Sequence, residues 1–214
     1  MIQVIASETL QLLPQRAIFW PRERMLIVAD IHFGKAAAFR AQGVPVPHGT
    51  TAQNLATLDV LLGLHDVAQI VFLGDFLHAK SARAPRTLTA MQVWRERHAA
   101  LRMTLVRGNH DVHAGDPPAA MRLQVVSEPY RIGVFSFCHH PDALPDTYVL
   151  AGHVHPVFRL TGRGDAVRLP CFLVGPRRAI LPSFGAFTGG HAITPAAGEQ
   201  VFVAADDVVV AVPR

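Results

Sequence analysis

Five continuous apolar runs, each ending in a polar side chain, constrain this chain more than any other feature. The runs read MLIVAD, IVFLGD, TLVRGN, GVFSFCH and YVLAGH, and they end at Asp30, Asp75, Asn109, His139 and His153. Runs this continuous are typical of strands buried on both faces. Because open α/β sheets build their sites at the carboxyl ends of strands, we expect these five side chains to meet.

Helical patterns separate the early strands. Thr50–Leu64 carries leucines at helical spacing, and Arg86–Ala100 places Leu88, Met91 and Trp94 on one side with charges opposite. After about residue 110 the segments are short and strand-like. The sequence therefore predicts βαβ units in the first half, a β-rich second half, and an α/β fold of two sheets packed face to face with helices outside.

The length and composition fit one folded unit. The chain has 214 residues, half of them apolar, without a linker, repeat or low-complexity segment, so we expect a single domain over residues 1–214. The absence of a basic leader and of any apolar span long enough for a bilayer predicts a cytoplasmic protein without membrane contact. Cys138 and Cys171 show no C-x-x-C spacing, which favours reduced thiols.

The charge balance permits a polyanionic partner without establishing one. The formal net charge is +4, from 20 Lys and Arg against 16 Asp and Glu. Basic residues near the polar motifs have two interpretations, a track for a nucleic-acid backbone or solvated surface charge. They are Lys35, Arg40, Lys80, Arg83, Arg86, Arg107, Arg177 and Arg178.

The polar motifs at the ends of the runs are rich in histidine, the commonest side chain that binds transition metals. Their order is D-x-H, G-D-x-x-H, G-N-H-D, H and G-H-x-H, in a chain with 12 histidines. Each motif alone is also typical of a capped turn or a satisfied polar pair, but five at strand ends favour one shared site. In G-H-x-H, alternation along a strand points both imidazoles the same way.

This order of motifs, over residues 30–155, resembles the calcineurin-like metallophosphoesterase superfamily. The resemblance implies a four-layer α/β/β/α sandwich of the calcineurin-like metallophosphoesterase type, with a two-metal site at the strand ends. It also implies a set of ligands: one metal held by Asp30, His32 and His155, a bridge at Asp75, and a second metal held by Asn109, His139 and His153. The catalytic histidine that binds no metal is then His110.

Elementary chemistry supports this assignment. Oxygen and imidazole ligands without thiolate suit Mn, Fe or Zn, and we expect two divalent ions, with Mn favoured. Two divalent ions carry four positive charges, and Asp30 and Asp75 neutralise two of them. A bridging hydroxide neutralises a third, so about one positive charge remains, which matches the single negative charge of a phosphodiester. His110 directly follows a ligand, so it is placed to stabilise developing charge or protonate the leaving oxygen. Asp111 is expected to orient the turn or a ligand.

Three assignments have alternatives. His139 is favoured as the ligand over His140, which points to the opposite face if the strand continues. His78 is the second predicted catalytic residue, and its place in the motif resembles that of a histidine in DNA-processing nucleases of the superfamily. The sequence leaves three roles open for it: orienting His110, contacting the phosphate, or capping a helix. The glycines of LPSFGAFTGG favour a structural turn over a loop beside the metals.

A narrower resemblance covers Leu10 to Gly190, in stretches such as VADIHFGKAAAFRAQGVPVP, GHVHPVFRL and LPSFGAFTGG. These are similar to the ligase-associated DNA damage response endonucleases. That family implies metal-dependent cleavage of DNA in repair, and its name implies a functional association with a DNA ligase or a helicase. The sequence shows no element that reads bases, so DNA binding without sequence specificity is expected. The alternatives are a phosphoesterase for a small nucleotide or cyclic nucleotide, and a non-catalytic interaction protein.

Overall fold

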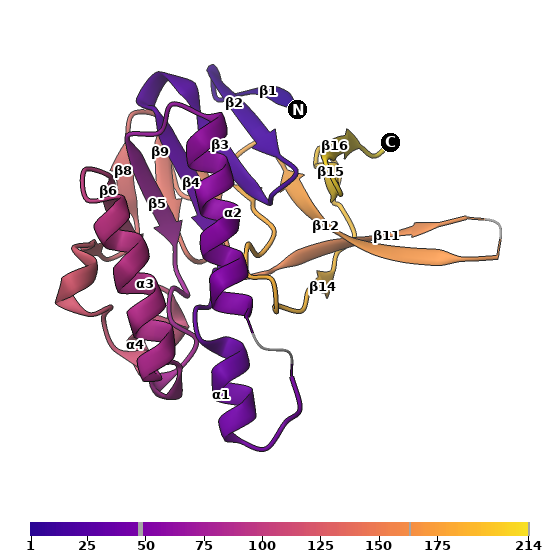
Figure 1. Cartoon of the computed structure of the whole chain (residues 1–214). Coiled ribbons are helices and arrows are strands. Elements are labelled where there is room, and N and C mark those ends of the chain that lie inside the picture. The colour runs from indigo at the N-terminus through magenta and orange to yellow at the C-terminus, as the bar shows by residue number, and fades with distance from the viewer. Residues whose placement is uncertain (47–48, 163, 214) are drawn as a thin grey trace.

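Two mixed β-sheets packed face to face form the body of the molecule in the computed structural model, which describes residues 1–46, 49–162 and 164–213 (Figure 1). The first sheet contains, side by side in chain order, β1 (Ile2–Ile5), β2 (Glu8–Leu13), β3 (Ala17–Trp20), β4 (Met25–Ala29), β5 (Gln69–Leu73), β6 (Arg102–Val106) and β7 (Gln124–Val126). Strands β1 to β4 alternate in direction and β4 to β7 run parallel, so β4, β5 and β6 end at one edge.

The second sheet contains the strands of the β-rich half. Its path runs through β14 (His191–Ala192), β11 (Pro156–Thr161), β12 (Ala166–Val174), β13 (Arg178–Ile180), β10 (Tyr148–Ala151), β9 (Phe135–Cys138) and β8 (Tyr130–Ile132). Strand β15 (Gln200–Ala205) pairs with β12 and with β16 (Val208–Ala211). Strands β9, β10 and β13 run parallel to one another. Strand β12 is antiparallel to β11, β13 and β15.

All the described α-helices begin before residue 110, and two of them, α2 and α3, cover the outer face of the first sheet (Figure 1). The α-helices are α1 (Lys35–Ala41), α2 (Thr50–Leu64), α3 (Pro85–Arg97) and α4 (Asn109–Ala114), and short 3₁₀ turns span Pro21–Glu23, Lys80–Arg83 and Ala119–Met121. In β4, Leu26 and Val28 pack against the helices, whereas Ile27 and Ala29 pack against the second sheet. Burial on both faces explains why the run is continuously apolar.

The expected α/β fold with two packed sheets and helices outside is confirmed, and α2 has the bounds that the leucine spacing indicates. Every α-helix in the described part of the chain ends before residue 115, however, so the outer face of the second sheet is covered differently. Residues 139–147 join the parallel strands β9 and β10 without a helix, and Leu144 packs on Cys138, Val149 and Ala151. Pro141 and Pro145 disfavour a helix in so short a connection.

None of the described helices combines the length and the apolar character that a membrane span requires.

Asn54, on the buried face of α2, holds two loops at the edge where β4 ends. Its Nδ2 donates to the carbonyl of Ile31 at 3.0 Å, and its Oδ1 accepts from the backbone N–H of Ala186 at 2.9 Å. The residues these bonds connect are far apart in the sequence. A single amide side chain therefore links the loop after β4 to the segment after β13.

We expect Asn54→Ala to lower the free energy of unfolding by about 2–4 kcal/mol, because two buried backbone groups lose their partners. Urea denaturation followed by circular dichroism measures the change. The control is Gln53→Ala at the neighbouring exposed position, expected to stay within about 0.5 kcal/mol of the unsubstituted protein. Equal losses for the two variants would contradict the linking role of Asn54.

Candidate metal centre

The five polar residues that end the apolar runs meet at the edge where β4, β5, β6, β9 and β10 end. Each strand stops one to three residues before its polar residue. Three groups of side chains form there, and the ligand-type atoms of each group lie within 4.8 Å of one another. The groups are Asp30, His32, Asp75 and His155; His139, His140 and His153; and His32, His78 and His110.

The first group contains buried polar atoms that lack partners. Within the described residues, Asp30 Oδ1, His32 Nε2 and His155 Nε2 are buried without a hydrogen bond. His155 Nε2 lies 3.4 Å from Asp30 Oδ1. A buried polar atom without a partner is costly, so three together indicate a site whose ligand is a cation.

Asp75 lies between the first group and the second. Its Oδ2 is 3.6 Å from His32 Nε2, and its Oδ1 is 3.5 Å from His139 Nε2. Oδ1 also accepts from the backbone N–H of His110 at 3.0 Å. Each carboxylate oxygen thus faces a different group, which is the geometry of a bridging ligand.

In the second group the ring of His139 is fixed from one side. Its Nδ1 donates to the carbonyl of Leu73 at 3.0 Å, so in the neutral tautomer Nε2 carries the lone pair. That atom lies 2.8 Å from Asn109 Oδ1 and 3.0 Å from His153 Nδ1. These three atoms are all of types that ligate metal ions, so this group also fits a metal.

The backbone turns through the left-handed region at five of these residues. The φ angles are +52° at Asp30, +47° at His32, +51° at Asp75, +69° at His153 and +50° at His155. Strand β10 ends at Ala151, so the alternation expected for G-H-x-H does not apply. Instead the two turns send His153 to the second group and His155 to the first.

His110 is held at the mouth of the site. Its Nδ1 donates to the carbonyl of His78 at 2.7 Å, its Nε2 is 3.9 Å from Asp75 Oδ2, and its side chain is 37% exposed. The rings of His78 and His110 stack with centroids 5.0 Å apart. Neither 3₁₀ turn Lys80–Arg83 nor α3 has a side-chain cap, so His78 does not serve as a helix cap.

Burial keeps several imidazoles neutral. The pKa of His32 lies far below its usual range because of burial, then Lys35 and His155. Burial, with Lys35 and His110 nearby, lowers the pKa of His78 to about 4. The pKa of His153 is lowered by burial and then by His139 and His140. Neutral rings offer the lone pairs that a metal needs.

Glu128 fixes the turn that carries His139 and His140. Its Oε2 accepts from the backbone N–H groups of His139 and His140 at 2.7 and 3.0 Å, and its Oε1 accepts from His140 Nδ1 at 2.6 Å. His140 is partly buried, with a side chain 41% exposed, whereas His139 is fully buried. Both histidines belong to the second group. Within the described residues, only His139 of these two forms a hydrogen bond with Asn109.

Asp111 orients the turns that carry the site, in line with the sequence. Its Oδ1 accepts from the backbone N–H groups of Phe76 and Leu77 at 2.9 and 3.3 Å. Its Oδ2 accepts from Gly108 N–H at 2.9 Å. Burial raises the pKa of this carboxyl group. The bonds tie the loop after β5 to the start of α4, where Asn109 and His110 lie.

The LPSFGAFTGG segment lies beside the site rather than serving only as a turn. Ser183 Oγ donates to the carbonyl of Asp30 at 2.8 Å. Phe187 forms an edge-to-face pair with Phe39 of α1, centroids 5.9 Å apart, and both line an open cleft of about 410 Å³ with Lys35. The Phe39 ring lies 5.8 Å from that of His78. An aromatic wall therefore adjoins the histidines.

Five of the eight basic residues singled out from the sequence have acceptors within the protein. Arg40 donates to the carbonyl of Val46 at 3.4 Å. Arg83 donates to the carbonyls of Ala114 and Asp116, and Arg107 pairs with the Asp116 carboxylate at 2.7 Å. Arg177 donates to Leu144 O, and Arg178 to Pro141 O. These five arginines use part of their donors on acceptors within the protein, so their contacts do not single out a track among them.

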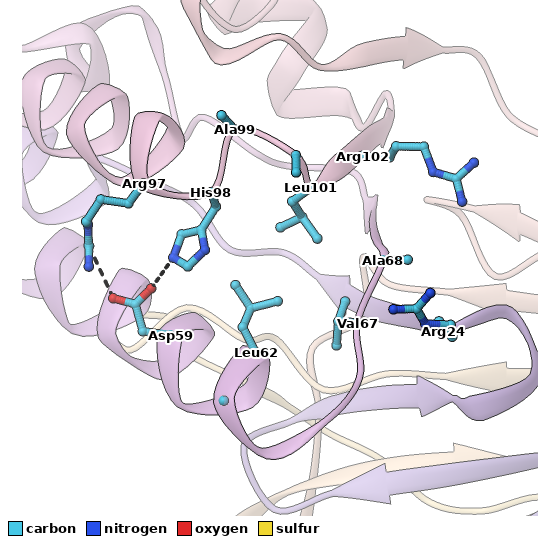
Figure 2. Close-up of a pocket in the computed structure, with 12 residues that line it drawn as sticks. Arg24, Asp59, Leu62, Val67, Ala68, Arg97, His98, Ala99, Leu101 and Arg102 are labelled. Atoms are coloured by element: carbon cyan, nitrogen blue, oxygen red, sulfur yellow. Dashed lines mark hydrogen bonds and ion pairs between the residues drawn. The ribbon is translucent and has the colours of Figure 1, made fainter.

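The pocket in Figure 2, of about 720 Å³, lies at the opposite end of the first sheet. Arg97 and His98, at the end of α3, both contact Asp59 of α2, and Leu62, Val67 and Leu101 line the hollow. Strands β5 and β6 begin here, whereas the metal-type groups lie where they end. The pocket is therefore separate from the candidate site.

Comparisons with known proteins agree with this geometry. The family model described as calcineurin-like phosphoesterase matches residues 23–164. A Pseudomonas putida nuclease, MPE, has a crystal structure with a TM-score of 0.89 and 46% identity, over 99% of each chain. An Aquifex aeolicus protein of unknown function has a TM-score of 0.41 and 20% identity, over 61% of this chain and 78% of its own. The search of curated proteins found no match.

Gly74 has no room for a side chain. A Cβ there would overlap the His139 ring, and φ is +77°. We expect Gly74→Ala to lower the free energy of unfolding by about 2 kcal/mol or more, from overlap and backbone strain. The control is Gly63→Ala in α2, where no atom lies within 4 Å and Ala is expected to stabilise by about 0.5–1 kcal/mol. Thermal denaturation compares the two; equal melting temperatures would refute the close packing around His139.

Proposed function

The chain belongs to the calcineurin-like phosphoesterase family, and from this premise we propose that it is a phosphodiesterase that uses two divalent metal ions to cleave DNA. The observation that carries the proposal is the set of three buried ligand atoms without partners, on Asp30, His32 and His155. They adjoin a second group that shares Asp75 with them. A structural role for these residues leaves their burial unexplained.

The proposed ligands follow from the contacts. Asp30, His32 and His155 hold one ion, Asp75 bridges, and Asn109, His139 and His153 hold the other. His139 is preferred to His140 because its Nε2 faces Asn109 Oδ1, whereas His140 is bound by Glu128. Mn suits these oxygen and nitrogen donors, as do Fe and Zn. When bound, the ions supply Lewis acidity and acidify a coordinated water.

His110 is the proposed catalytic histidine. The His78 carbonyl and the His78 ring fix the imidazole, and this leaves Nε2 directed toward Asp75 at the mouth of the site. From there a protonated Nε2 donates to a phosphate oxygen or to the departing oxygen. His78 orients His110, and its neutral ring adds no charge that competes for the proton.

DNA is the proposed substrate for two reasons. The P. putida structure that matches almost the whole chain is a nuclease. The Phe39–Phe187 wall beside His78 offers an aromatic surface on which a nucleobase can stack. A role in DNA repair and an association with a DNA ligase or helicase follow from the family resemblance alone, and a cytoplasmic location is an expectation from the sequence; all three form the outer part of the proposal.

Purified protein, stripped of metal and then supplied with Mn²⁺, tests the activity on plasmid DNA, single-stranded DNA and bis-p-nitrophenyl phosphate. We expect cleavage of DNA and of the model diester, both abolished by chelator. Hydrolysis of the model diester without DNA cleavage across metals and salts would favour a small nucleotide substrate. Without hydrolysis of either, the enzyme proposal fails.

His110→Ala is expected to lower the rate of DNA cleavage by at least 100-fold, because proton transfer by a positioned side chain contributes about 10²–10⁴-fold. Metal content should stay at the level of the unsubstituted protein, since His110 is not among the proposed ligands. Elemental analysis after gel filtration, paired with initial rates, makes the comparison. Near-normal rates would remove His110 from catalysis.

Asp75→Asn is expected to weaken both metal sites, because each Asp75 oxygen faces one group. Each bound ion stabilises the unsubstituted protein by about 2.7 kcal/mol when the metal concentration is 100 times the dissociation constant of its site. In the variant the same concentration should give less than half this gain, measured by urea denaturation with and without Mn²⁺. Two ions bound as tightly as in the unsubstituted protein would contradict the bridge.

A further inference from the structure

Strands β11 and β12 form a ribbon that starts at the candidate metal centre and extends away from the body (Figure 1). Strand β11 begins directly after His155. Strand β14 pairs with its first two residues, and β13 and β15 pair with residues 171–174 of β12. In the described part of the chain, residues 158–161 and 166–169 pair only with each other. We call residues 158–162 and 164–169 the arm.

Arg159 and Arg168 lie directly opposite each other on the arm, and therefore on the same face. Like charges in this position destabilise an antiparallel pair unless an anion binds between them. Arg168 donates to the carbonyl of Gly190 at 2.8 Å, and both side chains belong to exposed residues. Neither forms an ion pair within the described residues, where Asp165 at the tip is the arm's one acid.

Arg16 adds a third positive charge where the arm meets the body. It lies in the turn between β2 and β3, is half-buried, and has no side-chain hydrogen bond or ion pair within the described residues. Burial lowers the pKa of its guanidinium group. A guanidinium group that is partly desolvated and lacks an acceptor favours an anionic ligand.

The position of Arg16 connects the metal centre to the arm. Together with His155, Pro170 and Gly190, it lines a crevice of about 20 Å³. Pro170 pairs with Val157 across the ribbon, so alternation places Pro170 on the face that carries Arg159 and Arg168. The cations thus follow one surface outward, from His155 past Arg16 to the arginine pair.

We propose that Arg16, Arg168 and Arg159 form a phosphate-binding row that guides a nucleic-acid strand from the metal centre along the arm. This deepens the proposed function: it makes the substrate a polymer longer than the nucleotides at the cleaved bond. Arginine binds phosphate through its planar fork and reads no bases, so the row gives affinity without sequence specificity.

The test compares Arg159→Gln, and Arg159→Gln combined with Arg168→Gln, with the unsubstituted protein. Binding of a fluorescent oligonucleotide is measured by anisotropy at several salt concentrations, and KM is measured for cleavage. Loss of two phosphate contacts should weaken DNA binding at least fivefold and reduce the slope of log K against log salt by about 1.4–1.8. Hydrolysis of bis-p-nitrophenyl phosphate, which is too short to reach the arm, should change less than twofold.

Two further variants separate charge from structure. Arg102→Gln removes the same charge from an exposed position at the start of β6, beside the pocket of Figure 2, and should leave DNA binding unchanged. Arg168→Lys combined with Arg159→Gln keeps the charge at position 168 but loses the fork, so it should retain more affinity than Arg168→Gln combined with Arg159→Gln.

The outcomes distinguish this proposal from the function it deepens. Unchanged affinity and salt slope in the double variant overturn the row, even if the protein cleaves DNA. An equal effect of Arg102→Gln also overturns it, because the effect is then one of net charge. A change in sedimentation mass without a change in DNA binding makes the arm a contact between copies of the chain. Weakened DNA binding in a protein that cleaves neither substrate supports the row and overturns the nuclease activity.

Discussion

The site depends on sharp backbone turns at the ends of parallel strands, made by Asp and His rather than by glycine. Five ligand-type residues have φ between +47° and +69°. A strained backbone of this kind costs about 1–3 kcal/mol per residue, and it persists only where surrounding contacts impose it. Asp111 holds the turn after β5, Asn54 the loop after β4, and Ser183 the carbonyl of Asp30. Without such turns the polar side chains that follow the strands would not converge on one site.

The two hydrophobic layers make that arrangement rigid. Leu26 and Val28 pack under the helices while Ile27 and Ala29 face the second sheet, so β4 cannot shift by one residue without exposing both layers. The same constraint applies to β5, where Ile70 belongs to the helix layer and Val71 to the layer between the sheets. Strands held in fixed register present Asp30 and Asp75 at fixed positions. The ligands of the proposed metal ions are therefore already in place before the ions bind.

The chemistry and the proposed recognition of a polymer use different parts of the chain. The groups around Asp75 come from tight turns at the ends of the strands, where burial lowers the pKa of His32 and of His153. Arg16, Arg159 and Arg168 come from a turn and a ribbon at the periphery, where guanidinium groups retain unused donors. A neutral buried cluster favours cations, and an exposed row of arginines favours phosphates. The metal-type groups and the arginine row adjoin because β11 begins directly after His155.

The sequence by itself determined the five buried strands, the helices at residues 50–64 and near 86–100, and the convergence of polar side chains, because these depend on local periodicity and on residue type. It did not indicate β1 to β3, which lie side by side in the first sheet, or the short helices α1 and α4. Only the tertiary structure decided that His153 and His155 separate, that His78 stacks on His110, and that Arg83 and Arg107 are occupied while Arg16 is not. These outcomes depend on left-handed turns and on contacts between residues distant in the chain, which no local pattern encodes.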